Sequence, residues 1–490
     1  MKYQHCLPIM LLLSAFVISG CNNVTPIPSS SSEPTSESTS LPSSDSSSSD
    51  DSSVAPAPTY LKKDVSVKMT PMFKTDPANP YIISLRYDDE FFLGSAKTYN
   101  PDLSMLSYGA SIATAQKERG IAFFYETGFE DITTYAYEIE PTINTLGYVI
   151  AHKSIDDFEL VTVAFRGFEY KMEWANNLTV GKTGNHEGFD ARGKEAYRDL
   201  QAYLASLASN KTLKLWINGY SRAGAVSNVL ASYILKENKV NVTQDNMFVY
   251  TFEAPASLCE ENAIDYENVH NITNKADIVT FVPPQKYGLS RCGVDYEIYD
   301  ENVVDLLKEF DEEAVMPEFN QMDFDENPLS NDIEVRDYVL NSIFNINEEE
   351  GNQDKYANTR EQYVDNYQTG LSLGVAFIFC LKDSTRNELI NDLLDKGIDA
   401  ISLIYDDTGV ALADFLKTYL DKDKITYDEN VLVSACAIVV KGVQNVFLSI
   451  LFLSLSNQFK ADLSRLIYMH FPETEYVLLK NAHQKAASLA

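Results

Sequence analysis

The residues from Leu215 to Ala225 carry the clearest chemical signal in the sequence. They form an apolar strand, a sharp turn with Ser221 at its tip, and the start of a helix (L-W-I-N-G-Y-S-R-A-G-A). Such a turn, a nucleophile elbow, lifts a serine hydroxyl above a sheet. It needs small residues two places before and after the serine, and Gly219 and Ala223 meet that need. The pattern predicts that Ser221 is a nucleophile.

A serine nucleophile needs a histidine that accepts its proton and a carboxylate that orients the histidine. On an elbow the expected chain order is serine, acid, histidine. Asp277 closely follows an expected strand, and we name Asp295 as the reserve acid. Of the six histidines, His470 and His483 come after Asp277. We favour His470, because it ends an apolar helical run, whereas His483 lies in a polar tail.

Alternating strands and helices must position these groups. Strands are expected at 146–151, 160–165, 213–218, 247–252 and 269–273, and helices at 103–117, 188–209 and 221–236. This alternation predicts an α/β fold with a mostly parallel sheet, and such sheets build their sites at the carboxyl ends of strands. After about Tyr296 the strand signals fade and helical periodicity dominates.

Six segments between about Leu103 and Pro284 resemble, in order, the motifs of the class 3 lipase family of α/β-hydrolases. The segments are A-F-R-G at 164–167, E-W-A-N-N-L at 173–178, H-E-G-F at 186–189, the elbow at 219–225, Y-T-F-E-A-P at 250–255 and N-K-A-D-I-V at 274–279. A seventh stretch, H-F-P-E at 470–473 with a later tyrosine, is similar to the family's histidine segment. The resemblance implies an α/β-hydrolase fold.

The resemblance also implies a chemistry. Ser221, His470 and Asp277 would form a triad that hydrolyses carboxylic esters of lipids or other acyl groups, without a metal or cofactor. The backbone N–H groups of Phe168 and Arg222 would bind the oxyanion. Two positions depart from the family: Ala223 replaces a glycine, and Phe168 stands where a small hydroxyl residue is usual. Together with a long insertion between Asp277 and His470, these departures leave open a decayed hydrolase that serves as a surface binding module. A third hypothesis keeps the triad but changes the bond, in a serine peptidase or acyltransferase.

Asp277 and His470 lie 193 residues apart, which is far more than such a core needs. We therefore expect a core at 60–296, an acidic helical insertion at 297–458 that forms a cap over the site, and a return to the core at 459–490. The alternative is a separate surface domain without a catalytic role. Asp323 and Glu334 imitate the spacing of a calcium loop, but proline occupies the position that needs glycine, so we expect a solvated loop.

The stretch from Val431 to Leu455 is long enough to span a membrane, but Lys441 lies near its middle. A central lysine costs about 2.5–3.5 kcal/mol on insertion scales. We expect buried helices, broken near Gly442, or an apolar surface that faces lipid or substrate.

The N-terminus predicts export. Lys2 precedes a short apolar run, and Ile18-Ser19-Gly20-Cys21 resembles the lipobox of bacterial lipoproteins, in which the cysteine is lipidated. The alternative is an ordinary signal peptide with a chance cysteine. Residues 1–20 would then be the signal and 21–59, rich in Ser, Thr and Pro, a disordered tether. We expect an extracytoplasmic protein anchored to the membrane through Cys21.

The composition limits the remaining possibilities. The 490 residues carry a formal charge of −32, which disfavours nucleic-acid partners. Residues 301–350 hold 16 acidic and 2 basic side chains, so the expected core is far less acidic than the whole. Cys259 and Cys292 are as well explained by two buried thiols as by a disulfide. The sequence does not fix an oligomeric state.

Overall fold

A seven-stranded sheet forms the centre of the computed structural model, which describes residues 60–489 except 73–78, 139–141, 143, 171–172, 208, 313, 315–330, 345–358, 397–401 and 455–464. The sheet order is β11-β9-β7-β6-β5-β4-β3. The pairs from β11 to β5 are parallel, and β4 and β3 add antiparallel pairs at one edge. The strands are β3 (Glu130–Tyr135), β4 (Tyr148–Ile155), β5 (Phe158–Phe165), β6 (Thr212–Tyr220), β7 (Met247–Phe252), β9 (Val269–Asn274) and β11 (Val294–Ile298).

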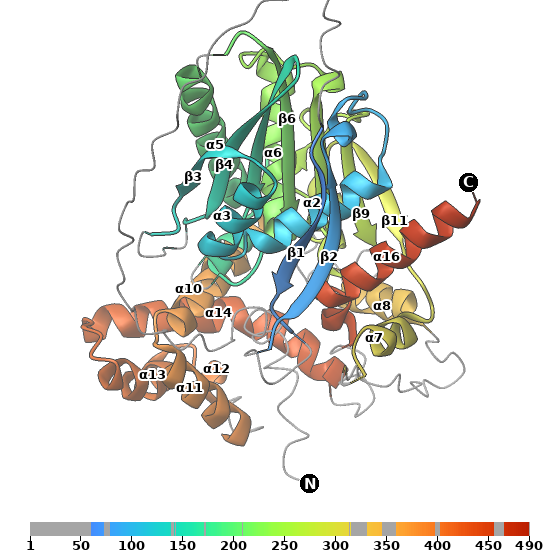
Figure 1. The fold of residues 1–490 in the computed structure, drawn as a ribbon. Helices are drawn as coiled ribbons and strands as arrows, with labels where there is room; N and C mark the ends of the chain where they lie inside the picture. The colour runs from blue at the N-terminus through green and yellow to red at the C-terminus, as the bar shows by residue number, and fades with distance from the viewer. Residues whose placement is uncertain are drawn as a thin grey trace, which may run out of the picture.

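Helices cover both faces of the sheet (Figure 1). Side chains alternate between the faces along each strand. On β6, for example, Trp216 and Tyr220 join one buried cluster, and Leu215 and Ile217 join the other. The first cluster packs under α2 (Pro101–Ala113), α3 (Lys117–Glu126) and α16 (Pro472–Leu489), and the second under α5 (Glu187–Ser206) and α6 (Arg222–Glu237). This confirms the predicted α/β class with its mostly parallel sheet.

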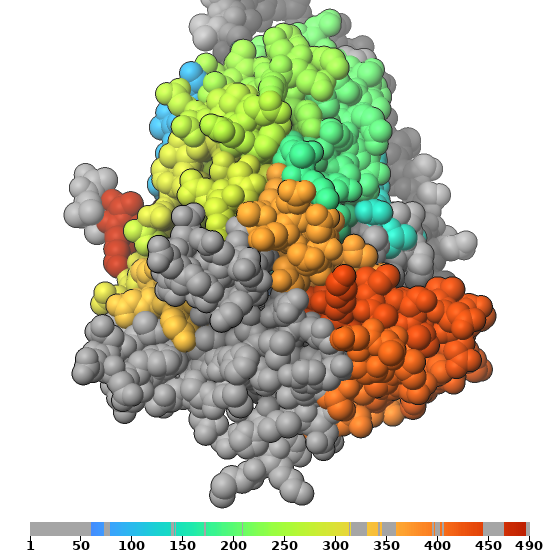
Figure 2. Space-filling view, turned by 180° about the vertical axis from the view of Figure 1, so that it is seen from behind, coloured from blue at the N-terminus to red at the C-terminus, as the bar shows by residue number. Residues whose placement is uncertain are grey.

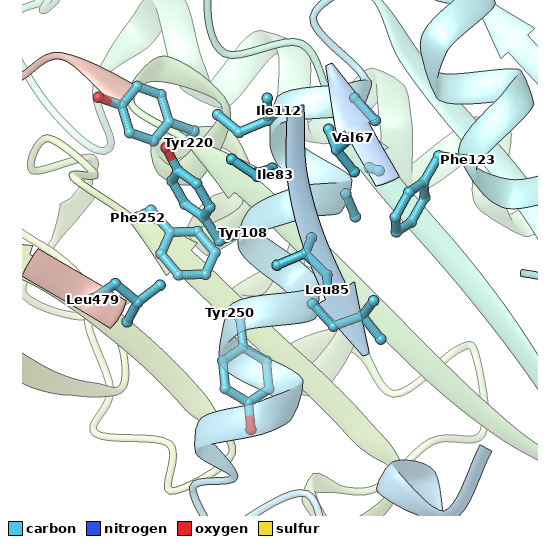
Figure 3. Packing of buried hydrophobic residues seen from close by; sticks show 14 of the residues in the cluster. Val67, Ile83, Leu85, Tyr108, Ile112, Phe123, Tyr220, Tyr250, Phe252 and Leu479 are labelled. Carbon is cyan, nitrogen blue, oxygen red and sulfur yellow. The ribbon is translucent and has the colours of Figure 1, made fainter. Parts of the chain in front are cut away.

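A β-hairpin that the sequence reasoning missed lies over α2. It pairs β1 (Lys62–Met69) with β2 (Tyr81–Asp88). Its buried residues alternate with exposed ones, and Val67, Ile83 and Leu85 pack toward Ile112 (Figure 3). Gly109 of α2 admits this close packing, because a Cβ there would lie 2.0 Å from Leu85 Cδ1. A smaller hairpin pairs β8 (Leu258–Cys259) with β10 (Leu289–Ser290).

The predicted elements agree with the structure with small shifts of their ends. The helix expected at 103–117 is really two, because α2 ends at Ala113 and α3 begins at Lys117. Asn100 caps α2 by accepting a hydrogen bond from the Leu103 N–H at 3.1 Å, with Pro101 in the first turn. Strand β11 continues to Ile298, two residues beyond the point where strand signals fade.

Among the described residues between β11 and α16 the regular elements are helices joined by turns. The helices are α7 (Val303–Phe310), α8 (Asp332–Phe344), α9 (Arg360–Tyr363), α10 (Thr369–Phe379), α11 (Asp383–Lys396), α12 (Ser402–Tyr405), α13 (Val410–Lys422) and α14 (Glu429–Ser454). A short π-helical stretch (Val364–Gln368) links α9 to α10. Helices α10 to α14 gather beyond one end of the sheet (Figure 1).

Helix α14 corrects the expectation of a break near Gly442, because it runs without interruption through that residue. Gly442 instead allows α14 to approach α10, since a Cβ there would lie 2.7 Å from Gly370 Cα. The apolar stretch is partly buried, with Cys436 and Val440 fully covered and Val431 exposed. Within the described part of the chain, no helix is long and apolar enough to cross a membrane.

Candidate active site

Strand β6 and helix α6 meet in a strained turn at Ser221. The serine has φ 56° and ψ −124°, a conformation that a residue with a side chain rarely adopts. Its N–H donates to Phe252 O at 2.7 Å, which ties the turn to the end of β7. A Cβ at Gly219 would lie 2.5 Å from the carbonyl of Ala223, so only glycine fits there. The local sequence therefore forms the expected elbow.

The structure brings Ser221, His470 and Asp277 together. Ser221 Oγ lies 2.8 Å from His470 Nε2, and His470 Nδ1 lies 2.6 Å from Asp277 Oδ2. The other carboxylate oxygen of Asp277 accepts the Val279 N–H at 2.8 Å. This is the hydrogen-bonded chain that activates a serine hydroxyl. Because both ring nitrogens of His470 are engaged, neither is free to ligate a metal beside Asp277.

The three residues differ in their exposure. The Asp277 side chain is fully buried, the His470 side chain is 14% exposed, and Ser221 is 6% exposed. The aspartate is thus shielded from water while the histidine and serine keep a narrow opening. Burial of the acid strengthens its electrostatic hold on the histidine.

Two tyrosines hold the backbone around His470, and the sequence reasoning did not single them out. The Tyr220 hydroxyl donates to the carbonyl of His470, and the Tyr220 ring stacks on the imidazole with centroids 5.6 Å apart. The Tyr108 hydroxyl donates to Pro472 O at 2.5 Å. The rings of Tyr108 and Tyr220 lie next to each other above the sheet (Figure 3). The signal available in the sequence was the position of Tyr220 directly before the serine.

The expected oxyanion donors lie on either side of the elbow. Arg222 is the first residue of α6, so its N–H has no partner within the helix. Phe168 follows Gly167, where a Cβ would lie 1.9 Å from Tyr220 O, so the loop runs directly against the elbow. Among the described residues, neither the Phe168 N–H nor the Arg222 N–H donates to another group. Two such donors beside the serine could bind a developing negative oxygen.

The aromatic side chain of Phe168 does not line the chain of three residues. It is 4% exposed and packs edge-on against Tyr220, with ring centroids 5.9 Å apart. Phe168, which stands where a small hydroxyl residue is usual in the family, therefore fills a core position. The Arg222 side chain is also buried and donates to Thr145 O at 3.1 Å. Burial lowers the pKa of this guanidinium to about 10.

The reserve candidates lie elsewhere. Asp295 pairs with Arg291, with Nη2 and Oδ2 2.5 Å apart, and His483 pairs with Asp102 at 3.2 Å. His186 is fully buried, stacks on a neighbouring phenylalanine and bonds a backbone carbonyl, so its role is structural.

The cysteines within the described chain are thiols. Cys259 and Cys292 are both free, which agrees with the reading of two thiols. Cys21 lies outside the described residues. So does most of the segment from Asp323 to Glu334, whose acidic residues have the spacing of a calcium loop.

Two buried glutamates behind the triad were missed. Glu253 follows β7 at φ 50° and is completely buried, and Glu475 in α16 is completely buried as well. A carboxylate oxygen of Glu253, one of Asp277 and a ring nitrogen of His470 all lie within 4.8 Å of one another. The sequence signal for Glu253 was its position as an acidic residue at the carboxyl end of a strand. No sequence signal pointed to Glu475.

The insertion docks beside the site. Arg360 of α9 donates to a row of core carbonyls, those of Val180, Gly181, Thr183, Gly184 and Asn185. Ser372 of α10 donates to Ala175 O, in the short helix α4 (Trp174–Asn177) that follows the Phe168 loop. The orange surface of the insertion lies directly against the green surface of the core (Figure 2). The insertion thus contacts the segment next to one oxyanion donor.

A second contact lies next to the acid. Arg336 of α8 donates to Lys275 O, two residues before Asp277, and its guanidinium lies 3.9 Å from the centroid of the Phe281 ring. The insertion therefore contacts the core both in α4 and in the segment just before Asp277.

The mostly parallel sheet, the strained serine after β6 and the acid after β9 define an α/β-hydrolase fold. The family model described as lipase (class 3) matches residues 161–287. The match includes the elbow and Asp277, but it ends before the insertion and before His470. Over this segment the chain is similar to class 3 lipases.

Several fungal lipases are similar to the chain. A lipase from Rhizomucor miehei is 26% identical over 161 residues, which are 30% of this chain and 43% of that protein's length. The structure of the native Rhizomucor miehei lipase propeptide complex aligns with 19% identity and a TM-score of 0.33, over 41% of this chain and 70% of that one. Lipase from Rhizopus microsporus var. chinensis aligns with 19% identity and a TM-score of 0.30, over 40% and 75%.

Proposed function

We propose that the protein is a serine hydrolase of carboxylic esters, similar to lipases, that acts on lipid or other acyl esters. The hydrogen-bonded chain from Ser221 through His470 to Asp277 is the observation that carries this proposal. The strained elbow and two unengaged N–H donors beside it supply the remaining parts. The similarity of residues 161–287 to class 3 lipases supports the same reaction.

The reaction follows from the geometry. Ser221 Oγ attacks the ester carbonyl while His470 Nε2 accepts the hydroxyl proton. Asp277 holds the Nδ1–H and stabilises the imidazolium that forms. The N–H groups of Phe168 and Arg222 bind the carbonyl oxygen as it becomes negative. His470 then returns the proton to the leaving alcohol, and water hydrolyses the acyl-enzyme by the same route.

The insertion acts as a cap over this site in our proposal. It contacts the α4 segment after the Phe168 loop and the backbone before Asp277. A cap at these two places would shape the passage of an acyl chain and exclude water. This is why we favour lipid or other acyl esters over a small polar substrate.

The competing readings differ in what the site should look like. A decayed hydrolase that serves as a binding module would be favoured by a His470 far from Ser221, whereas the 2.8 Å contact supports the hydrolase. A peptidase or acyltransferase would use the same triad on another bond, and no observed contact favours it.

The test is hydrolysis of p-nitrophenyl esters from short to long acyl chains by wild type and Ser221→Ala in parallel. We expect activity in the wild type and a loss of about 10⁴-fold or more in the variant, because the nucleophile is removed. A fluorophosphonate probe should label Ser221. An inactive wild type, an active Ser221→Ala variant or labelling of another residue would each refute the proposal.

The proposed location is outside the cytoplasm, on a lipid anchor at Cys21 with residues 21–59 as a tether. Its support is the lipobox-like Ile18-Ser19-Gly20-Cys21. Cys21→Ala should release the protein from the membrane fraction of a bacterial host, because acyl chains on one cysteine supply the affinity. Equal membrane retention of the variant would contradict the anchor.

A further inference from the structure

A group of buried carboxyls continues from the triad acid into the core. Glu253 lies at the end of β7, Glu475 lies in α16, and both have no exposed surface, like Asp277. A carboxylate oxygen of Glu253 lies within 4.8 Å of one of Asp277, and both Glu475 and Asp277 act on the Glu253 carboxyl group. Three carboxyl groups from three distant segments thus meet directly behind His470.

Among the described residues no lysine or arginine pairs with Glu253 or Glu475, and His470 is the basic group that bonds Asp277. The groups that act electrostatically on Glu253 are Glu475 and Asp277, and around them lie Tyr108 of α2, Tyr220 of β6 and Glu473 of α16. Within the described residues, neither Lys nor Arg is among them. Three negative charges at such a place would repel one another at low dielectric, so the group must retain protons.

The proton distribution follows from these surroundings. Burial, followed by the carboxylates of Glu475 and Asp277, raises the pKa of Glu253 well above its usual value. Burial also raises the pKa of Glu475 to about 7, with Asp277 adding to the rise and Glu253 opposing it. Glu253 is therefore neutral and carries a hydroxyl that it can donate. Glu475 changes its charge near neutral pH.

The backbone around Glu253 supports a dedicated role. A non-glycine residue at φ 50° is uncommon, and such strain collects at functional sites. The Asn274 N–H donates to the Glu253 carboxyl at 3.0 Å, and the Asn274 side chain donates to Met469 O at 3.0 Å. The same short network thus holds Glu253, the loop of Asp277 and the backbone before His470.

We propose that Glu253 and Glu475 are positioning residues that form a proton-sharing chain behind Asp277. The Glu253 hydroxyl donates to Asp277 and fixes the carboxylate that orients His470. Neutral Glu475 donates in turn to Glu253. When Glu475 loses its proton to solvent, it competes for the Glu253 hydroxyl and weakens the hold of Glu253 on Asp277. This inference rests on the proposed hydrolase function.

The experiment compares Glu253→Ala, Glu253→Gln and Glu475→Gln in the full chain with Glu473→Gln as the matched control. Glu473 is equally buried in the same helix turn, but it accepts the Met72 N–H. Glu253→Ala should lower kcat/KM about 10²-fold, as expected for a misplacement of about 1 Å. Glu253→Gln keeps an N–H donor, so its kcat/KM should lie much closer to that of the wild type than the kcat/KM of Glu253→Ala. The fall of kcat/KM above neutral pH should be smaller in Glu475→Gln, which keeps a neutral donor to Glu253, and unchanged in Glu473→Gln.

An infrared measurement tests the carboxyl chain without a substrate. At pH 8 the wild type and Ser221→Ala should both show the C=O band of a neutral carboxyl group, and Glu253→Gln should lose it. The inference is overturned by a missing band, by a wild-type kcat/KM in Glu253→Ala, or by a pH profile of Glu475→Gln that equals that of the wild type. If the band is present but no ester is hydrolysed, the proposed hydrolase function is refuted, whereas the proton sharing among the buried carboxyl groups is supported.

Discussion

Gly219→Ala is the perturbation that tests the elbow most directly. The added Cβ would lie 2.5 Å from both the carbonyl carbon and the carbonyl oxygen of Ala223, and 2.8 Å from Gly224 N. These are backbone atoms of the first turn of α6, so no side-chain rotation relieves the clash. The turn must open, and Ser221 moves with it.

The expected magnitude has two parts. Forcing a methyl group into packed backbone costs about 1–3 kcal/mol in the free energy of unfolding. The second part concerns the reaction. Ser221 Oγ lies 2.8 Å from His470 Nε2, and a displacement of about 1 Å would break that hydrogen bond and cost about 10²-fold in rate. Since 10²-fold in rate corresponds to about 2.7 kcal/mol, the losses in catalysis and in stability should be comparable.

The assay pairs urea unfolding with hydrolysis of a p-nitrophenyl ester and with the rate of fluorophosphonate labelling. Gly94→Ala is the matched control, because a Cβ at Gly94 meets nothing within 4 Å. It should leave both quantities within experimental error of the wild type. If Gly219→Ala hydrolyses and labels at the wild-type rate, the elbow is not the reason for glycine at this position and the reasoning is refuted.

Three further changes test the surrounding structure. Burial lowers the pKa of His186 to about 3, so below pH about 6.5 the unfolded chain binds a proton that the folded chain does not. The free energy of unfolding should therefore fall by about 1.4 kcal/mol per pH unit on acidification. His186→Phe should flatten this slope in denaturant titrations. Lys153→Met leaves the buried Asp89 carboxylate without its partner at 2.7 Å, and should lower the free energy of unfolding by about 3–5 kcal/mol. Arg360→Met removes the donors to five core carbonyls, and should speed hydrogen exchange in α9 and α10 but not in β6; unchanged exchange would contradict the docking.

The fold was predictable because its signals are local. A run such as Met247–Phe252 is apolar and β-rich whatever surrounds it, and it forms β7 with the expected bounds. The hairpin of β1 and β2 was missed because buried residues alternate with exposed ones along both strands, so neither forms a continuous apolar run and packing on α2 decides their burial. Gly442 was misjudged for a related reason. In isolation glycine weakens a helix, but here contact with Gly370 supports the continuous helix.

The sequence by itself determined the strand–turn–helix around Ser221 and the order of serine, acid and histidine. These depend on short-range sterics and on a pattern within a few residues. Tertiary structure decided everything that joins distant segments: the 2.8 Å contact of His470 with Ser221, the tyrosine bonds around His470, and the meeting of Glu253 with Glu475. The protonation state of a buried carboxyl has no sequence signature, because it depends on the charges and the solvent exclusion that folding brings to the group.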